Sequence, residues 1–486
     1  MIIARAIFFY LAVGGINASA SEHSGGNSLL IRAVTIIDGT GAQPTAPLDV
    51  EVIGNRITRI GQNLKSKASV VIDGTGKTLI PGLIDCHVHI RTVPGALFRD
   101  ENPEAIREQQ IFQLKSYLAA GVTTILDAAT PGPLFDEVAR ISRTYPVPRF
   151  LGLAPFLTPK NGYFASEESR RRFYSDLSKP VEKISEIRDR IEEAQKYHPF
   201  GLKTTIEYGF APFATFPVFD STYRAAIRTE AARANLPVMV HTEAEKAFWL
   251  ALDLKPYAFM HGGFFDKPAT QDIVQKIAES KAYVVSTLAI YKMMLLMWDQ
   301  NLFEDPWFQR LVPPEQIKTA QEVTSSVVKL LAVQNKPWFV PRFIAEWLSG
   351  FFIRRGAIQQ NYENSKISLK SMYDHGVPIV MGSDAGNYPL FSTFFHGVGS
   401  ILEVEALLDA GIPPLEVIHI STSRAAEMLK INKDVGTVAE GKIADLVLLN
   451  QSPLTSSKAF RDIALVIKDG QLLRNSITKR PPGTYE

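Results

Sequence analysis

The chain has almost no cysteine: Cys86 is the single one in 486 residues. An internal disulfide is therefore excluded, and stability has to come from a buried core. The chain also lacks an excess of charge of either sign, with 52 Lys plus Arg against 50 Asp plus Glu. This balance argues against nucleic acid as a partner and favours a small molecule.

Long hydrophobic runs are also missing. The apolar segments are shorter than the roughly 20 residues that cross a membrane, or charges interrupt them, so we expect no stable membrane span. At the N-terminus, Arg5 precedes an apolar run over 6–13 and the small residues Ala18-Ser19-Ala20. This pattern predicts a secretory signal peptide over 1–20 and hence an exported protein, periplasmic or secreted. A membrane anchor is the alternative interpretation.

Two kinds of strand pattern divide the remaining chain. Short alternating strands between Asn, Asp and Gly turns occupy 28–80, and a similar pattern returns over 436–476, which predicts a small antiparallel β-sandwich domain built from both chain ends. Between them, apolar runs alternate with helical patterns, as in βα units around a parallel sheet. These runs predict a (β/α)8 TIM-like barrel over 81–435. Its eight strands are expected near 82–89, 122–127, 148–154, 201–207, 236–241, 257–261, 282–287 and 378–383.

The connection between the last two predicted strands is unusually long. We expect a helical insertion at about 290–370, with its aromatic residues concentrated over 338–353. One interpretation is that these residues pack on themselves. The other is an apolar lid over the barrel mouth that selects hydrophobic substrates, because insertions after barrel strands surround the active face.

Two histidines, His87 and His89, stand at the end of the first barrel strand. Side chains at i and i+2 of a strand project to one face, so both imidazoles can reach one metal ion. Alternation points Cys86 away from them, and we interpret it as a small buried hydrophobe. An isolated pair of histidines is also compatible with ordinary core or surface residues.

Three more strand ends carry residues that bind metals. His241 ends the fifth predicted strand, His261 the sixth and Asp384 the eighth. Singly, such a histidine is more often a hydrogen-bonded core residue, and such an aspartate a helix cap or turn. Because the carboxyl ends of barrel strands meet at one face, the set predicts a metal site.

The fourth strand places Lys203, Thr205 and Glu207 on one face, whose direction the sequence does not fix. Pointing inward, Lys203 would have to be neutral or modified, since an ammonium group repels metal ions. Reaction with carbon dioxide would make it an anionic carbamate that bridges two ions. Glu207 is the alternative ligand and needs no modification.

With these residues in place, the chain resembles the amidohydrolase superfamily, and within it the imidazolonepropionase-related branch. The resemblance runs from about Ile36 to Leu472. Besides the ligand positions, it rests on Ile37-Asp38-Gly39-Thr40-Gly41, Leu79-Ile80-Pro81-Gly82-Leu83-Ile84-Asp85, Phe395-His396-Gly397 and the segment 436–447. It implies a metal-dependent barrel, a β-sandwich from both chain ends, and hydrolysis at carbon centres.

The resemblance also implies roles for the strand-end residues. His87, His89 and Asp384 would hold the more buried ion, His241 and His261 the second, and a carboxylated Lys203 would bridge them. Asp384 would take the proton of a metal-activated water and deliver it to the leaving nitrogen, and with a single ion His261 would polarise the carbonyl. Zn2+ suits the imidazoles best, with Mn2+ and Fe2+ as alternatives because carboxylates suit them.

Two further residues, His396 and Tyr208, are candidate substrate contacts, with a structural role as the alternative. The expected reaction is hydrolysis of a carbon–nitrogen (amide) bond in a small molecule, such as a dipeptide, an N-acyl amino acid or a cyclic amide, with an apolar group if the insertion is a lid. A mononuclear deaminase of the same superfamily and an inactive binding relative are the alternatives. The sequence leaves open the substrate and whether the chain forms a homo-oligomer.

Overall fold

The computed structural model describes residues 28–90, 103–165, 178–209, 216–264, 267–314, 316–321, 341, 354–386 and 392–473. The predicted signal peptide (1–20) lies outside the described residues, so it stays a prediction. The aromatic segment 338–353 also lies outside them except for residue 341, and the lid hypothesis stays a prediction too. Among the described helices, none is long and apolar enough to cross a membrane.

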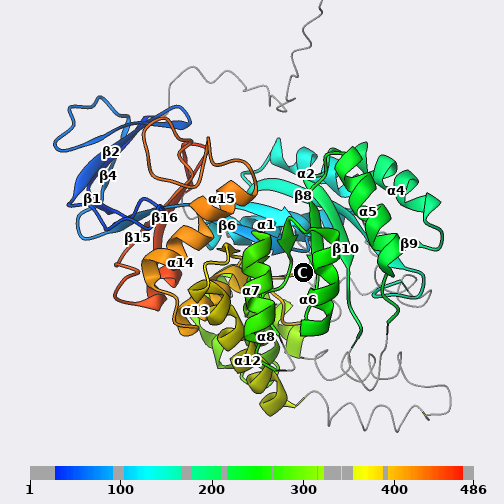
Figure 1. The fold of residues 1–486 in the computed structure, drawn as a ribbon. Helices are drawn as coiled ribbons and strands as arrows, with labels where there is room; N and C mark the ends of the chain where they lie inside the picture. Colours follow the sequence, from blue (N-terminus) through cyan, green and yellow to red (C-terminus); the bar gives the residue numbers. More distant parts are fainter. Residues whose placement is uncertain are drawn as a thin grey trace, which may run out of the picture.

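Eight parallel strands form the predicted barrel (Figure 1). In sheet order they run from β14 to β6, and β9 (Ser178–Val181) adds to the edge of β8. A parallel bridge between Val88 and Ala385 brings the two ends of the sheet together. Each predicted barrel run overlaps one of these strands, so the fold class is confirmed. The strands are β6 (Leu83–Val88), β7 (Val122–Asp127), β8 (Arg149–Pro159), β10 (Gly201–Thr205), β11 (Val238–His241), β12 (Ala258–Phe259), β13 (Tyr283–Val285) and β14 (Ile379–Val380).

Helices alternate with these strands and cover the outside of the barrel. Local sequence defines their ends and faces: Asp220 caps α5 by accepting from the backbone N–H groups of Thr222 and Tyr223. The helices are α1 (Pro103–Ala119), α2 (Gly132–Ser142), α4 (Ser185–Gln195), α5 (Ser221–Arg233), α6 (Glu245–Ala251), α7 (Gln271–Ser280), α8 (Ala289–Leu295), α9 (Pro306–Leu311), α12 (Arg355–Asp374), α13 (Val398–Asp409), α14 (Pro414–Ser421) and α15 (Ser423–Met428). Short 3-10 turns are η2 (Leu252–Leu254), η3 (Asn301–Glu304) and η4 (Ser457–Arg461).

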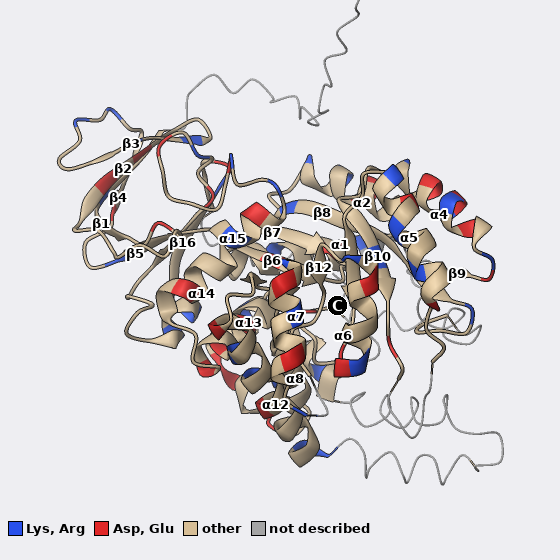
Figure 2. Cartoon of the chain, in the orientation of Figure 1, with Lys and Arg blue, Asp and Glu red and all other residues tan. Residues whose placement is uncertain are grey.

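The described part of the predicted insertion is helical. It contains α8, η3, α9 and most of α12, and α12 packs against α7 and α8 before the chain enters β14. Both signs of charge are interspersed on the outer helices α4 and α5 (Figure 2), where Arg188 pairs with Glu230 and Arg233 with Glu192.

Alternation along the strands separates an inner from an outer apolar cluster. Met239 and Val285 belong to the inner one, whereas their neighbours Val240 and Val284 pack with the helices. Cys86 is fully buried in the inner cluster, as a small hydrophobe should be. Our expectation that it points away from the histidine face is wrong, because the pairing of β6 with β7 shifts register between Asp85 and Val88.

Both chain ends contribute to a second, eight-stranded sheet, as predicted, and Figure 1 shows it beside the barrel near α14 and α15. β1 changes partners at Ala33, whose φ is 51°. Before it, β1 pairs with β2 and β4, and after it with β5, while a single pair with β2, Val34 with Leu48, follows the irregularity. The pairs with β4 and β5 are parallel, so the sheet is mixed rather than wholly antiparallel. The strands are β1 (Ser28–Ile36), β2 (Leu48–Ile53), β3 (Arg56–Gly61), β4 (Val70–Asp73), β5 (Thr78–Pro81), β15 (Leu446–Leu449), β16 (Ile463–Lys468) and β17 (Gln471–Leu473).

Candidate metal centre

The carboxyl ends of five barrel strands bring six predicted side chains together inside the barrel mouth. All six are buried, with between 0% and 8% of each residue exposed. The inner position of Lys203 settles the direction of the fourth strand's face, which the sequence left open. The six are His87 and His89 after β6, Lys203 on β10, His241 on β11, His261 after β12 and Asp384 after β14.

The first group of donors surrounds Asp384. Its Oδ1 atom lies 3.2 Å from Nε2 of His87 and 3.2 Å from Nε2 of His89. Two ligands of a tetrahedral ion with bonds of about 2.0–2.1 Å stand about 3.3 Å apart. The spacing of these three side chains therefore fits a divalent ion.

A second group adjoins the first through His261. Nε2 of His261 lies 2.8 Å from Nδ1 of His241, and the donor atoms of His241, Glu243 and His261 all lie within 4.8 Å of one another. The donors of His87, His261 and Asp384 satisfy the same limit. The geometry is therefore that of two neighbouring cation positions.

The strand-four residues separate in space. Nζ of Lys203 lies 3.3 Å from Nε2 of His87, next to the first group. Glu207 instead accepts from the Gly209 backbone N–H through Oε1 at 2.7 Å, and its Oε2 lies 3.7 Å from Nε2 of His241. Lys203 thus contacts the first group, and its charge also acts on both histidines of the second, whereas Glu207 adjoins His241 alone of these histidines.

Burial sets the protonation of these groups. It lowers the pKa of His87, His241 and His261 well below the usual value, with Lys203 or a neighbouring histidine adding to the effect. Neutral imidazoles offer the lone pairs that a metal needs. Burial also lowers the pKa of Lys203 to about 8, against the opposing influence of Asp384.

Buried polar atoms without partners test the fit to a metal. Among the described residues, Nε2 of His241 and Oε2 of Glu207 have no hydrogen bond although both are buried. Such atoms are costly unless something satisfies them. These two atoms lie 3.7 Å apart, so a cation between them would satisfy both. The second donor group uses the other nitrogen of His241, Nδ1, and its fit to a divalent ion comes from its two imidazoles and one carboxylate.

Two hydrogen bonds fix how the histidines present themselves. Nδ1 of His87 lies 2.8 Å from the Met260 carbonyl oxygen, which leaves Nε2 for a ligand bond. Nδ1 of His261 lies 3.0 Å from Oγ1 of Thr287. Thr287 has φ 53°, a strained value for a β-branched residue that costs on the order of 1–3 kcal/mol and is typical of functional sites.

Thr287→Val should weaken metal binding, because it removes the hydroxyl that orients His261 while preserving side-chain shape. Loss of such a partner lowers metal affinity about 10- to 100-fold. Equilibrium dialysis against Zn2+ measures the change. Thr242→Val is the matched control, because the Thr242 hydroxyl is buried without a hydrogen bond among the described residues. Equal affinities in both variants would contradict the role of Thr287.

The structure also places the other candidate residues. Nδ1 of His396 lies 2.8 Å from the Tyr117 hydroxyl, and the His396 ring packs against Gly386, which follows the Asp384 loop. Tyr208 lies beside Glu207, with Nζ of Lys246 3.8 Å from its ring centroid. Sequence reasoning missed Glu243. Its position two residues after His241 repeats the spacing of His87 and His89 and was the available signal.

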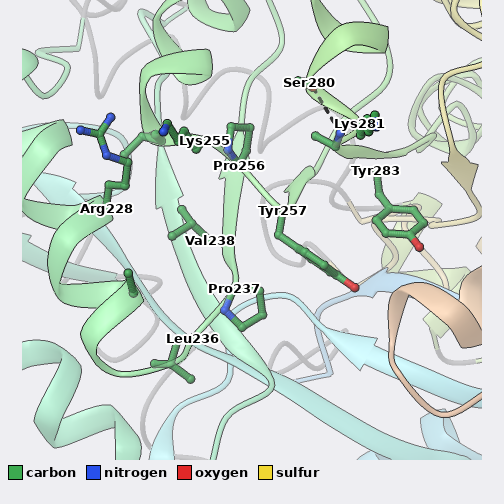
Figure 3. A pocket seen from close by; sticks show the side chains of 13 residues that line it. Arg228, Leu236, Pro237, Val238, Lys255, Pro256, Tyr257, Ser280, Lys281 and Tyr283 are labelled. Carbon is green, nitrogen blue, oxygen red and sulfur yellow. Dashed lines mark hydrogen bonds between the residues drawn. The ribbon is translucent and has the colours of Figure 1, made fainter.

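A separate pocket lies at the opposite end of the barrel (Figure 3). Its volume is about 470 Å³, and Pro237, Tyr257 and Tyr283 line it at the amino ends of β11, β12 and β13. Reactive groups of α/β barrels stand at the carboxyl ends of the strands. This pocket is therefore not part of the candidate metal centre.

Fold and site together define a class, that of α/β barrels with a histidine and carboxylate centre at the strand ends. The Amidohydrolase family matches residues 78–473, and the chain belongs to this family. The narrower resemblance to the imidazolonepropionase-related branch stays a prediction.

Individual relatives are similar over shorter or more distant matches. The chain is 32% identical over 114 residues to a dihydroorotase of Pelotomaculum thermopropionicum, covering 24% of each chain. It is 38% identical over 116 residues to an allantoinase of Enterococcus faecalis, covering 24% of this chain and 22% of the relative. The chain thus matches about a quarter of these relatives' length.

Solved structures share the fold over nearly the whole chain. A Xaa-Pro dipeptidase superposes with a TM-score of 0.68 at 20% identity, covering 92% of this chain and 99% of the other. Molinate hydrolase gives a TM-score of 0.68 at 18% identity, covering 95% and 99%. At these identities the similarity establishes the fold.

Proposed function

We propose that this protein is a binuclear metal-dependent amidohydrolase that cleaves the amide bond of a small molecule, such as a dipeptide, an N-acyl amino acid or a cyclic amide. The observation that carries the proposal is the pair of adjoining donor groups built from His87, His89, His241, His261 and Asp384. Relatives named as dipeptidase, dihydroorotase and allantoinase support amide substrates, both linear and cyclic.

His87, His89 and Asp384 would hold one ion in this proposal, and His241 and His261 would hold the other. A divalent ion lowers the pKa of water toward about 7 and stabilises a developing oxyanion. Asp384 accepts the proton of the attacking water at a carboxylate oxygen and delivers it to the leaving nitrogen. This delivery is needed because an amide anion is a very poor leaving group. In a centre with a single ion, Nε2 of His261 would donate a hydrogen bond to the substrate carbonyl and take the place of the second ion in stabilising the oxyanion.

Lys203, carboxylated to a carbamate, would supply an anionic oxygen ligand to both ions. Its place beside His87 supports this role, and so does the pKa of about 8, because the free amine is the form that reacts with carbon dioxide. The first choice of ion is Zn2+, with Mn2+ and Fe2+ as alternatives given the carboxylate donors.

Metal content per chain tests the proposal, measured by elemental analysis after dialysis for wild type and Lys203→Ala. We expect about two ions in wild type and about one in the variant, together with amide hydrolysis by wild type in a screen of dipeptides, N-acyl amino acids and cyclic amides. Lys276→Ala is the control, because Lys276 pairs with Glu279 on the surface. One ion in all three proteins would remove Lys203 from the centre and favour a mononuclear deaminase.

A further inference from the structure

We infer that Glu243 is a ligand of the second ion and completes a set of two histidines and one carboxylate with His241 and His261. The inference rests on the proposed function, since it assigns one more residue to the same centre. It gives that ion a protein carboxylate that requires no modification, in addition to Lys203.

Donor spacing supports this assignment. Oε1 of Glu243 lies 4.0 Å from Nε2 of His261, and that nitrogen lies 2.8 Å from Nδ1 of His241. The two distances bracket the separation of about 3.3 Å expected between ligands of a tetrahedral ion. A shift of under about 1 Å in each pair therefore gives ligand geometry, which is within the rotamer freedom of a glutamate.

Chain direction explains why Glu243 reaches the centre. The chain continues from His241, the last residue of β11, through three residues without helix before α6 begins at Glu245. Residues at i and i+2 of an extended chain project to the same side, as His87 and His89 do. The Glu243 side chain is 22% exposed, so it faces the barrel mouth rather than bulk solvent.

Charge around Glu243 also favours a cation. The charged groups that act on it are Glu207, Asp384 and Lys203. Three carboxylates therefore share this space with two amines among the described residues, Lys203 and Lys246, and carbamate formation on Lys203 would remove one of the two positive charges. Buried carboxylates in such excess either take up protons or bind a counter-ion. A divalent ion between Glu243 and the histidines supplies it.

The assignment of Glu243 affects the order in which the second ion binds and Lys203 is carboxylated. Two histidines and one glutamate form one of the three-ligand sets of catalytic zinc, which leaves a fourth position for water or substrate. The second ion can then bind before Lys203 is carboxylated. Loss of Lys203 should weaken this ion without abolishing its site, whereas loss of Glu243 should weaken it even when the carbamate is present.

Titration of the metal-free full chain with Co2+ tests the inference, by calorimetry and by the visible absorption of bound cobalt. The proteins are wild type, Glu243→Gln and the matched control Glu245→Gln. Glu245 lies on the same segment but binds Thr270, with Oε1 2.8 Å from the Thr270 hydroxyl. We expect Glu243→Gln to weaken the second Co2+ at least tenfold and change its spectrum, with the first ion unaffected. Glu245→Gln should resemble wild type.

Two results would overturn the inference. One is a folded Glu243→Gln variant whose affinity for the second Co2+ is unchanged, and the other is a wild-type protein that binds only one ion. Circular dichroism checks folding, and Glu243→Asp replaces the glutamine variant if that fails to fold. The aspartate keeps the charge on a shorter side chain, so we expect its affinity for the second Co2+ to lie between that of wild type and that of a chain without this carboxylate. Amide hydrolysis by wild type is measured separately. If wild type binds two ions and is active while Glu243→Gln keeps its affinity for the second ion, the inference fails and the proposed function stands.

Discussion

An Asp384→Asn variant is expected to lower kcat for amide hydrolysis by about 10³-fold or more. A positioned acid or base contributes about 10²- to 10⁴-fold, and an amide side chain can neither accept the water proton nor return it. The loss of a ligand adds to this, because Oδ1 of Asp384 contacts both His87 and His89. Steady-state kinetics on the best amide of the screen measures the change.

Metal content separates the two contributions of Asp384. If the variant loses its first ion, saturating Zn2+ should restore occupancy while kcat stays low. Asp384→Glu keeps the carboxylate and should recover part of the rate. A kcat within tenfold of wild type in the metal-loaded Asn variant would exclude Asp384 as the proton carrier.

The second large effect is a pH dependence of stability caused by Glu403. Burial raises the pKa of this carboxyl to about 7, although the Ser286 hydroxyl and the Ala289 backbone N–H both donate to it. The unfolded chain releases the proton near pH 4.5. The native state therefore binds more protons between pH 4.5 and 7, and the free energy of unfolding falls by about 3 kcal/mol as pH rises through that window.

Glu403→Gln isolates this contribution because its amide is neutral at every pH. We expect the fall in unfolding free energy between pH 4.5 and 8 to be smaller by about 3 kcal/mol in the metal-free variant, as measured by urea unfolding. The charged and titratable groups that act on Glu403 are Asp85, Lys292 and Tyr362. Parallel curves for both proteins would show that Glu403 is ionised in the folded state.

Much of the barrel and of its centre could be predicted because the strands recur as similar runs and the candidate ligands recur at their carboxyl ends. Each strand is a short apolar run, and His87, His241 and Asp384 follow such runs, so one rule about strand ends brings them together. Pairing was harder to predict. Alternation assigns Cys86 to the wrong face because the sequence carries no mark of the register shift beside it.

The remaining features depend on contacts distant in the chain. The direction of Lys203 follows from its neighbours on β8 and β11, and β1 changes its parallel partner from β4 to β5 at Ala33, within one sheet. Glu243 was missed because it lies beyond the apolar run that ends at His241. Substrate identity depends on the shape of loops at the barrel mouth, which strand and helix periods do not encode.

The sheet formed from both chain ends has a consequence for biosynthesis. β5 pairs with β1 on one side and with β15 on the other, so residues 78–81 find their second partner strand only at residues 446–449. A ribosome must therefore release almost the entire polypeptide before this edge of the nascent protein can be covered. Until then the edge is open to intermolecular pairing. Helper proteins that shield unfinished chains would protect this edge during translation, because no strand from the early part of the chain covers it.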